Sequence, residues 1–159
     1  MLIERHIKLY FSQKYGRKGF IMKVNHNSEL YTNCVFLGGT CADSTWRKEL
    51  ISKLKDSVPY FDPQVPDWTP EDAEREDACK LVSGINVFVI TGDALSTYSG
   101  FEISEEAHRA PEKLVFATVG ELPANQVKGI EKIKKALRSK GCRVCESLDE
   151  IAEILNQAY

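Results

Sequence analysis

The stretch Ile85-Asn-Val-Phe-Val-Ile-Thr91 is the strongest β-strand signal in the chain. β-Branched and aromatic residues fill it, and Gly84 and Gly92 bound it. A nearly continuous apolar run is typical of a parallel strand that helices cover on both faces. Similar runs at residues 34–39 and 114–119 indicate that this strand has neighbours of the same kind.

Helical segments alternate with the strands along the chain. Thr69-Pro-Glu-Asp72 and Ser147-Leu-Asp-Glu150 are capping boxes, and apolar residues recur at helical spacing after the second. The predicted strands cover residues 34–39, 58–62, 85–91, 114–119 and 142–145. The predicted helices cover residues 44–54, 69–83, 100–109, 125–140 and 147–155. Five consecutive βα units predict an α/β fold with a flavodoxin-like, doubly wound parallel sheet of order 2-1-3-4-5.

Residues 1–32 do not follow this alternation. They carry six basic and two acidic side chains, and they indicate two strands around a basic turn at residues 12–18. We therefore expect an N-terminal β-hairpin extension at 1–32 and one α/β domain at 33–159. The hairpin has two interpretations: a sheet edge or subunit contact, or a basic flap that attracts a phosphate or a nucleic acid.

Composition narrows the functional class. The 159 residues have a net charge of −2, so no global charge favours nucleic acid, and no apolar run approaches the length of a membrane span. A signal-peptide pattern is absent. The five cysteines are odd in number and irregularly spaced, which is typical of reduced cytoplasmic thiols. The Cys142-Arg-Val-Cys145 pair lacks further metal ligands, so neither a metal nor a cofactor is expected.

The ligand site of such a sheet lies beyond the carboxyl ends of the strands, where the strand order reverses. Phosphate-loop, dinucleotide and nucleophile-elbow motifs are absent there, and histidines are few. Polar, glycine and aromatic residues follow the strands at this edge. The candidate substrate-binding residues are Gly38, Gly39, Thr40, Trp46, Asp62, Gln64, Trp68, Tyr98, Ser99 and Gly100.

The chemistry must then come from carboxylates. We expect Glu102 in the first turn of the helix after the third strand, where the helix dipole would keep it ionised and able to attack an anomeric carbon. The alternative is that Ser99-Gly-Phe-Glu102 is only a capping box. Asp77 lies in an acidic helical run typical of a solvated face, and Asp93 is either a site residue or a turn residue.

Three stretches together carry a family resemblance: Val35-Phe-Leu-Gly-Gly-Thr40, Phe61-Asp-Pro63 and Tyr98-Ser-Gly-Phe-Glu102. They resemble the nucleoside 2-deoxyribosyltransferase superfamily. The stretches at residues 38–47 and 67–70 are closer to its deoxyribosyltransferase-like branch. The resemblance covers about residues 33–155 and leaves the hairpin outside.

The resemblance implies an enzyme that cleaves or exchanges the N-glycosidic bond of a nucleoside or nucleotide. Glu102 would be the nucleophile that forms a covalent deoxyribosyl intermediate. Asp77 would assist the leaving base, and Gln64 would contact the substrate. Homo-oligomers are typical of the family. This chain departs from it at Phe36, where the family usually has a tyrosine that orients the glutamate, and Tyr98 is a candidate replacement.

Two other functions fit the same sequence. A non-catalytic nucleotide or sugar-nucleotide sensor would keep the pocket, and Phe36 favours it. An interaction module would use the basic hairpin to contact a partner.

Overall fold

The computed structural model describes residues 33–41, 43–94 and 96–159. Within these residues, five parallel strands form one sheet of order β2-β1-β3-β4-β5. The strands are β1 (Val35–Gly39), β2 (Tyr60–Phe61), β3 (Ile85–Thr91), β4 (Leu114–Val119) and β5 (Arg143–Cys145). The doubly wound fold and its strand order, both predicted from the sequence, are confirmed.

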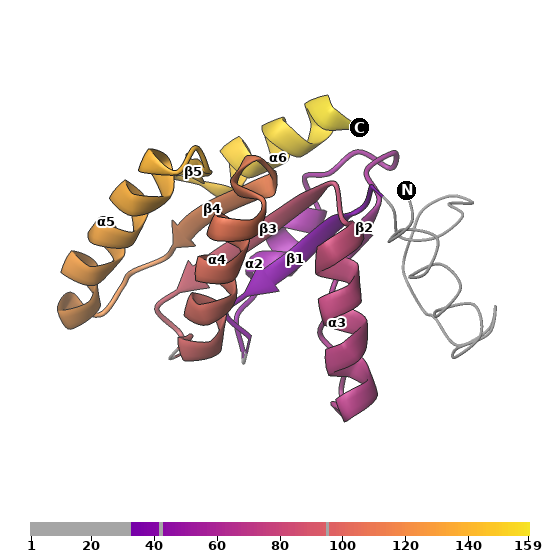
Figure 1. Ribbon diagram of the computed structural model, residues 1–159, viewed down its shortest axis with the longest axis horizontal. Helices are drawn as coiled ribbons and strands as arrows, with labels where there is room; N and C mark the ends of the chain where they lie inside the picture. Colours follow the sequence, from indigo (N-terminus) through magenta and orange to yellow (C-terminus); the bar gives the residue numbers. More distant parts are fainter. Residues whose placement is uncertain (1–32, 42, 95) are drawn as a thin grey trace.

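Helices cover the two faces of the sheet (Figure 1). They are α2 (Trp46–Ile51), α3 (Pro70–Val82), α4 (Thr97–Arg109), α5 (Ala124–Ser139) and α6 (Leu148–Ala158), with a short 3-10 turn at Pro111–Lys113. α2 and α6 pack on one face, whereas α3, α4 and α5 pack on the other. On the second face, α4 packs on β3 and β4.

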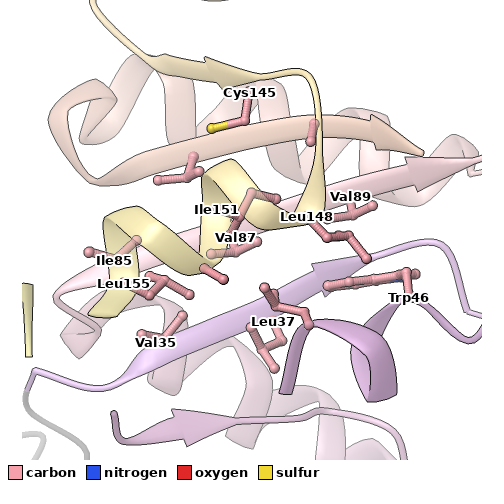
Figure 2. Close-up of a cluster of buried hydrophobic side chains, with 14 of the residues drawn as sticks. Val35, Leu37, Trp46, Ile85, Val87, Val89, Cys145, Leu148, Ile151 and Leu155 are labelled. Carbon is pink, nitrogen blue, oxygen red and sulfur yellow. The ribbon is translucent and has the colours of Figure 1, made fainter. Parts of the chain in front are cut away.

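Each face has its own buried cluster of apolar side chains. Figure 2 shows the first, in which Trp46 of α2 and Leu148, Ile151 and Leu155 of α6 cover residues of β1 and β3. The second contains aromatic rings from three neighbouring strands, Phe36, Phe88 and Phe116. The central strand β3 contributes to both clusters and is buried along its whole length, as its composition predicts.

Several predicted elements differ from the observed ones at their ends. β2 keeps only Tyr60 and Phe61, because Pro59 and Pro63 flank it and cannot donate ladder hydrogen bonds. The first helix was predicted at residues 44–54, but α2 starts after Thr45 and ends at Ile51. The Thr69 capping box is confirmed, with both of its hydrogen bonds present. At α6 only half of the predicted box forms: Ser147 Oγ accepts from the Glu150 N–H, whereas the Glu150 carboxylate accepts from the backbone N–H of Glu146.

Two further expectations concern the N-terminal hairpin and membrane-spanning helices. The predicted hairpin at 1–32 lies outside the described residues. Among the residues that are described, no helix has both the length and the apolar character that a membrane crossing requires.

Candidate active site

The Glu102 carboxylate is buried between α3 and α4. Its side chain is 8% exposed, and Oε1 lies 2.6 Å from Lys80 Nζ, whose side chain is 9% exposed. The same ammonium contacts Asp77 Oδ1 at 2.9 Å, although Asp77 itself is mostly exposed. Burial alone would lower the pKa of Lys80, but its bonds to Glu102 and Asp77 outweigh burial and raise this pKa. Lys80 is therefore a firmly protonated cation shared by two carboxylates.

The position of Glu102 in α4 differs from the one predicted from the sequence. α4 begins at Thr97, three residues before the predicted start, so Glu102 lies in the second turn. The expected capping box of Ser99 and Glu102 is wrong, because Ser96 is the N-cap and Ser99 is a buried residue within the helix. Pairing with Lys80, rather than proximity to the helix N-terminus, explains how this buried carboxylate is held.

The backbone of Lys80 is fixed by a second group of contacts. Its carbonyl oxygen accepts hydrogen bonds from Asn86 Nδ2 at 3.2 Å and Arg109 Nη2 at 3.3 Å. The buried Glu106 carboxylate joins these two donors, at 2.7 Å from Asn86 Nδ2 and 2.6 Å from Arg109 Nη2. These bonds connect the end of α3 to β3 and α4. They hold Lys80 in reach of Glu102.

The surroundings of this ion pair are partly aromatic and partly open. Lys80 Nζ lies 5.7 Å from the centre of the Phe36 ring, on β1. A hollow of about 560 Å³ between α3 and α4 is bordered by Asp77, Lys80 and Arg109 among others. Lys80 thus lines an open space on one side and contacts the buried Glu102 on the other.

The loop after β1 is fixed by the protein itself. Gly39 has φ +123°, and a Cβ there would meet the carbonyl oxygen of Val89 at 2.0 Å. Thr40 is 1% exposed, and its Oγ1 accepts from the backbone N–H of Thr91 at 3.0 Å and bonds to Ser96 Oγ at 2.6 Å. At Gly38 the Phe88 ring occupies the space a Cβ would need, at 2.4 Å. These glycines allow close packing of β1 on β3; ligand contact by them stays a prediction.

The buried Arg47 also shapes this loop. Its guanidinium donates to the carbonyl oxygens of Leu37 at 3.0 Å and Thr40 at 2.8 Å, and it lies 3.5 Å from Asp62 Oδ1. Trp46 Nε1 donates to the same Thr40 carbonyl at 2.9 Å. Because the Trp46 ring belongs to the cluster on the α2 and α6 face, it does not lie with Glu102.

Four other residues predicted for the site lie apart from Glu102. Asp62 accepts from the backbone N–H of Gln64, which is exposed at the same edge. Asp93 is exposed and accepts from Thr91 Oγ1 at 2.7 Å within its own turn. Gly100 lines a separate apolar groove of about 300 Å³ between α4 and α5.

Two aromatic side chains are exposed near the carboxylates. Tyr98 is 64% exposed and packs on Phe101, with ring centres 6.3 Å apart. Burial raises the pKa of Tyr98, and the charges of Glu102 and Asp77 act in the same direction. Trp68 is 60% exposed and precedes α3 in the chain. Sequence reasoning passed over Glu76, which is half-buried and within electrostatic reach of Glu102.

The model of one protein family, described as nucleoside 2-deoxyribosyltransferase like, matches residues 32–119. This range is more than half of the chain, and it contains both Glu102 and the α3 residues that surround it. The chain belongs to the nucleoside 2-deoxyribosyltransferase-like family. Membership indicates glycosyl transfer on nucleosides as its chemistry. A search of curated proteins found no match.

The structure shows what surrounds Phe36, the position at which this deoxyribosyltransferase-like chain departs from the family pattern. Phe36 has no hydroxyl with which to orient Glu102, and Lys80 Nζ lies over its ring while binding Glu102 Oε1. Tyr98, the candidate replacement named from the sequence, is mostly exposed. The ammonium of Lys80 is therefore the observed partner of the glutamate in this chain.

Proposed function

We propose that this protein cleaves or transfers the N-glycosidic bond of a nucleoside or nucleotide, with Glu102 as the nucleophile. The observation that carries the proposal is the buried Glu102 carboxylate, which is held by Lys80. Lys80 also borders a hollow between α3 and α4, although Glu102 is not among the residues that line this hollow. A fixed carboxylate is the group that attacks an anomeric carbon in retaining glycosyl transfer.

The reaction would proceed by two displacements. A carboxylate oxygen of Glu102 bonds to C1′ as the bond from C1′ to the base nitrogen breaks, and the base leaves with that electron pair and a proton from an acid. In the second step, a nitrogen of another base, or water, attacks C1′ and breaks the sugar ester, which restores the carboxylate. Two inversions retain the configuration at C1′.

Lys80 would position the nucleophile during both steps. It binds Oε1, so attack would use Oε2, and the Asn86, Glu106 and Arg109 contacts keep the ammonium in place. Asp77 and Asp93 are candidate acids for the leaving base, as the sequence suggested. Asp77 lies beside the pair of Lys80 and Glu102, whereas Asp93 bonds within its own turn.

Substrate binding would use the exposed groups at the same edge of the sheet. Trp68 and Tyr98 offer ring faces for a nucleobase, because aromatic stacking is the common way in which proteins hold a single base. Gln64 and the loop of Gly38, Gly39 and Thr40 are proposed contacts for the sugar.

A panel of 2′-deoxynucleosides, each incubated with a second free base and separated by chromatography, tests this function. The wild type is expected to release a base or form the exchanged nucleoside, and Glu102→Gln should lose about 10³-fold or more of that rate. Glu153→Gln, on α6 across the sheet, is the control that keeps the activity. Base release at the wild-type rate by a folded Glu102→Gln variant would contradict the proposal.

The second candidate is a nucleotide or sugar-nucleotide sensor without turnover. It is favoured by Phe36 and by the tight engagement of Glu102 with Lys80. Isothermal titration with the same nucleosides separates the two functions, because binding without any product would select the sensor.

A further inference from the structure

A groove lies between α4 and α5, which pack on the same face of the sheet (Figure 1). Its volume is about 300 Å³, at the lower end of the range typical of small-molecule sites. Gly100, Ser104 and Ala107, each about one helical turn from the next, line it on the α4 side. The Glu102 carboxylate leaves α4 in another direction, toward Lys80 on α3. The groove is therefore separate from the candidate active site, and its ligand does not depend on the proposed function.

The lining of the groove is mostly apolar and partly open to solvent. The sheet contributes Ile90 of β3 and Phe116 of β4, and α5 contributes Ile130 and Ile133. Ile133 is 40% exposed, so other parts of the described chain do not cover this surface. A Cβ placed on Gly100 would meet no atom within 4 Å, which shows that the space beside α4 is empty. An apolar ligand in this space would remove exposed hydrophobic surface from water.

One end of the groove carries a positive charge. Lys140, which directly follows α5, places Nζ 3.0 Å from His108 Nε2 on α4. His108 Nδ1 lies 2.6 Å from the carbonyl oxygen of Ser104, which can only accept, so Nδ1 carries the proton and Nε2 accepts from the ammonium. In the part of the chain that the structure describes, no carboxylate pairs with Lys140, whereas Glu146 pairs with Lys134. Two N–H groups of the Lys140 ammonium are therefore available to a ligand.

The charges around this end favour an anion. A helix C-terminus presents partial negative charge through its free carbonyl groups. At the end of α5, however, the backbone N–H groups of residues 140–142 bond to the carbonyl oxygens of residues 136–138. The exposed Glu105 borders the hollow on the α3 side of α4 and is not part of the groove lining. The full charge of Lys140 therefore determines which ligand charge is favoured at this end.

We propose that the groove between α4 and α5 binds a small amphipathic carboxylate, such as a fatty acid of medium chain length. The apolar chain lies along the groove between the two helices, over Ile133 and Phe116. The carboxylate lies at the Lys140 end and accepts a hydrogen bond from Nζ, which stays bonded to His108. A charged acceptor makes the stronger hydrogen bond with an ammonium. Among chains of equal length, the groove therefore selects the one that ends in a carboxylate.

Isothermal titration calorimetry of the full chain at pH 7.5 tests the proposal with three probes of equal length: octanoate, 1-octanol and octylammonium. Octanoate should bind one-to-one and about 5-fold more tightly than 1-octanol, because an exposed ionic contact contributes up to about that factor, and octylammonium should bind most weakly. Lys140→Gln should weaken octanoate by the same factor and leave 1-octanol unchanged. Lys135→Gln, an exposed lysine of α5 outside the groove, is the control that keeps the affinity.

A second variant tests the location of the ligand. Ser104 lines the groove and is exposed, so Ser104→Phe places a ring in the groove without disturbing the core, and it should remove binding of both octanoate and 1-octanol. Circular dichroism checks that each variant is folded. Absence of octanoate binding by the wild type, equal affinity for octanoate and 1-octanol, or unchanged octanoate binding by Lys140→Gln or by folded Ser104→Phe would each overturn the proposal.

Discussion

Lys80 contributes to the site through both its side chain and its backbone. Nζ binds Glu102 at 2.6 Å in a largely buried pair, while the carbonyl oxygen accepts bonds from Asn86 and Arg109. Burying an ion pair costs desolvation that the pair must offset, so each partner depends on the other. At the scale of single residues, the position of the Glu102 carboxylate therefore depends on Lys80.

We expect Lys80→Met to destabilise the protein by about 3 kcal/mol at pH 7.5, because it leaves the Glu102 carboxylate buried without its cation. In urea unfolding, the double variant Lys80→Met with Glu102→Gln should cost about 1–3 kcal/mol less than the sum of the single variants. Strictly additive costs would show that the two side chains do not depend on each other.

The sequence singles out Glu102 but not its partner. Glu102 follows a strand at the expected edge of the sheet, which is a local feature that can be read from the chain order. Lys80 and Glu76 lie in a run of charged residues, and their relation to Glu102 depends on how α3 packs beside α4. That packing is set by contacts distant in sequence, so the sequence pattern does not show which residue of α3 binds Glu102.

At the scale of elements, the site depends on the close approach of β1 and β3. Gly39 pairs with Val89 and has a left-handed φ, and the carbonyl oxygen of Val89 occupies the place of a side chain. Only glycine adopts this conformation without strain. The loop that follows is then fixed by Arg47 and Thr40.

Gly39→Ala is expected to destabilise the protein by more than about 2 kcal/mol, since it combines a disfavoured φ with a clash against backbone. Gly129→Ala is the matched control. It lies inside α5 with no atom within 4 Å of the added methyl group, so it should stabilise by about 0.5–1 kcal/mol. Thermal unfolding of both variants measures the difference, and equal effects would contradict the role of Gly39.

At the scale of the whole molecule, topology was the most predictable feature. Buried runs such as residues 85–91 alternate with capped helices, and right-handed crossovers leave few arrangements for five such units. The start of α4 was less predictable, because Thr97, Tyr98 and Ser99 carry no strong helical signal before Gly100. That three-residue difference changed the explanation of Glu102.

The raised pKa of Glu76 also leads us to expect that the stability of the molecule varies with pH. Its pKa is raised to about 7 in the folded protein, above the ordinary value of 4.5. Between these values the unfolded chain loses the proton first, so the contribution of Glu76 falls as pH rises from about 4.5 to 7 and then levels. Urea unfolding should show wild-type stability declining relative to Glu76→Gln across this window. A constant difference between the two proteins would contradict the shift.

The central claim, that Glu102 bonds to the sugar, is tested most directly by intact-mass analysis of the protein quenched in acid during turnover of a 2′-deoxynucleoside. We predict one added deoxyribosyl group, mapped by peptide mass spectrometry to Glu102 and absent from Glu102→Gln. Turnover without any adduct in the wild type, or an adduct on another residue, would contradict this account.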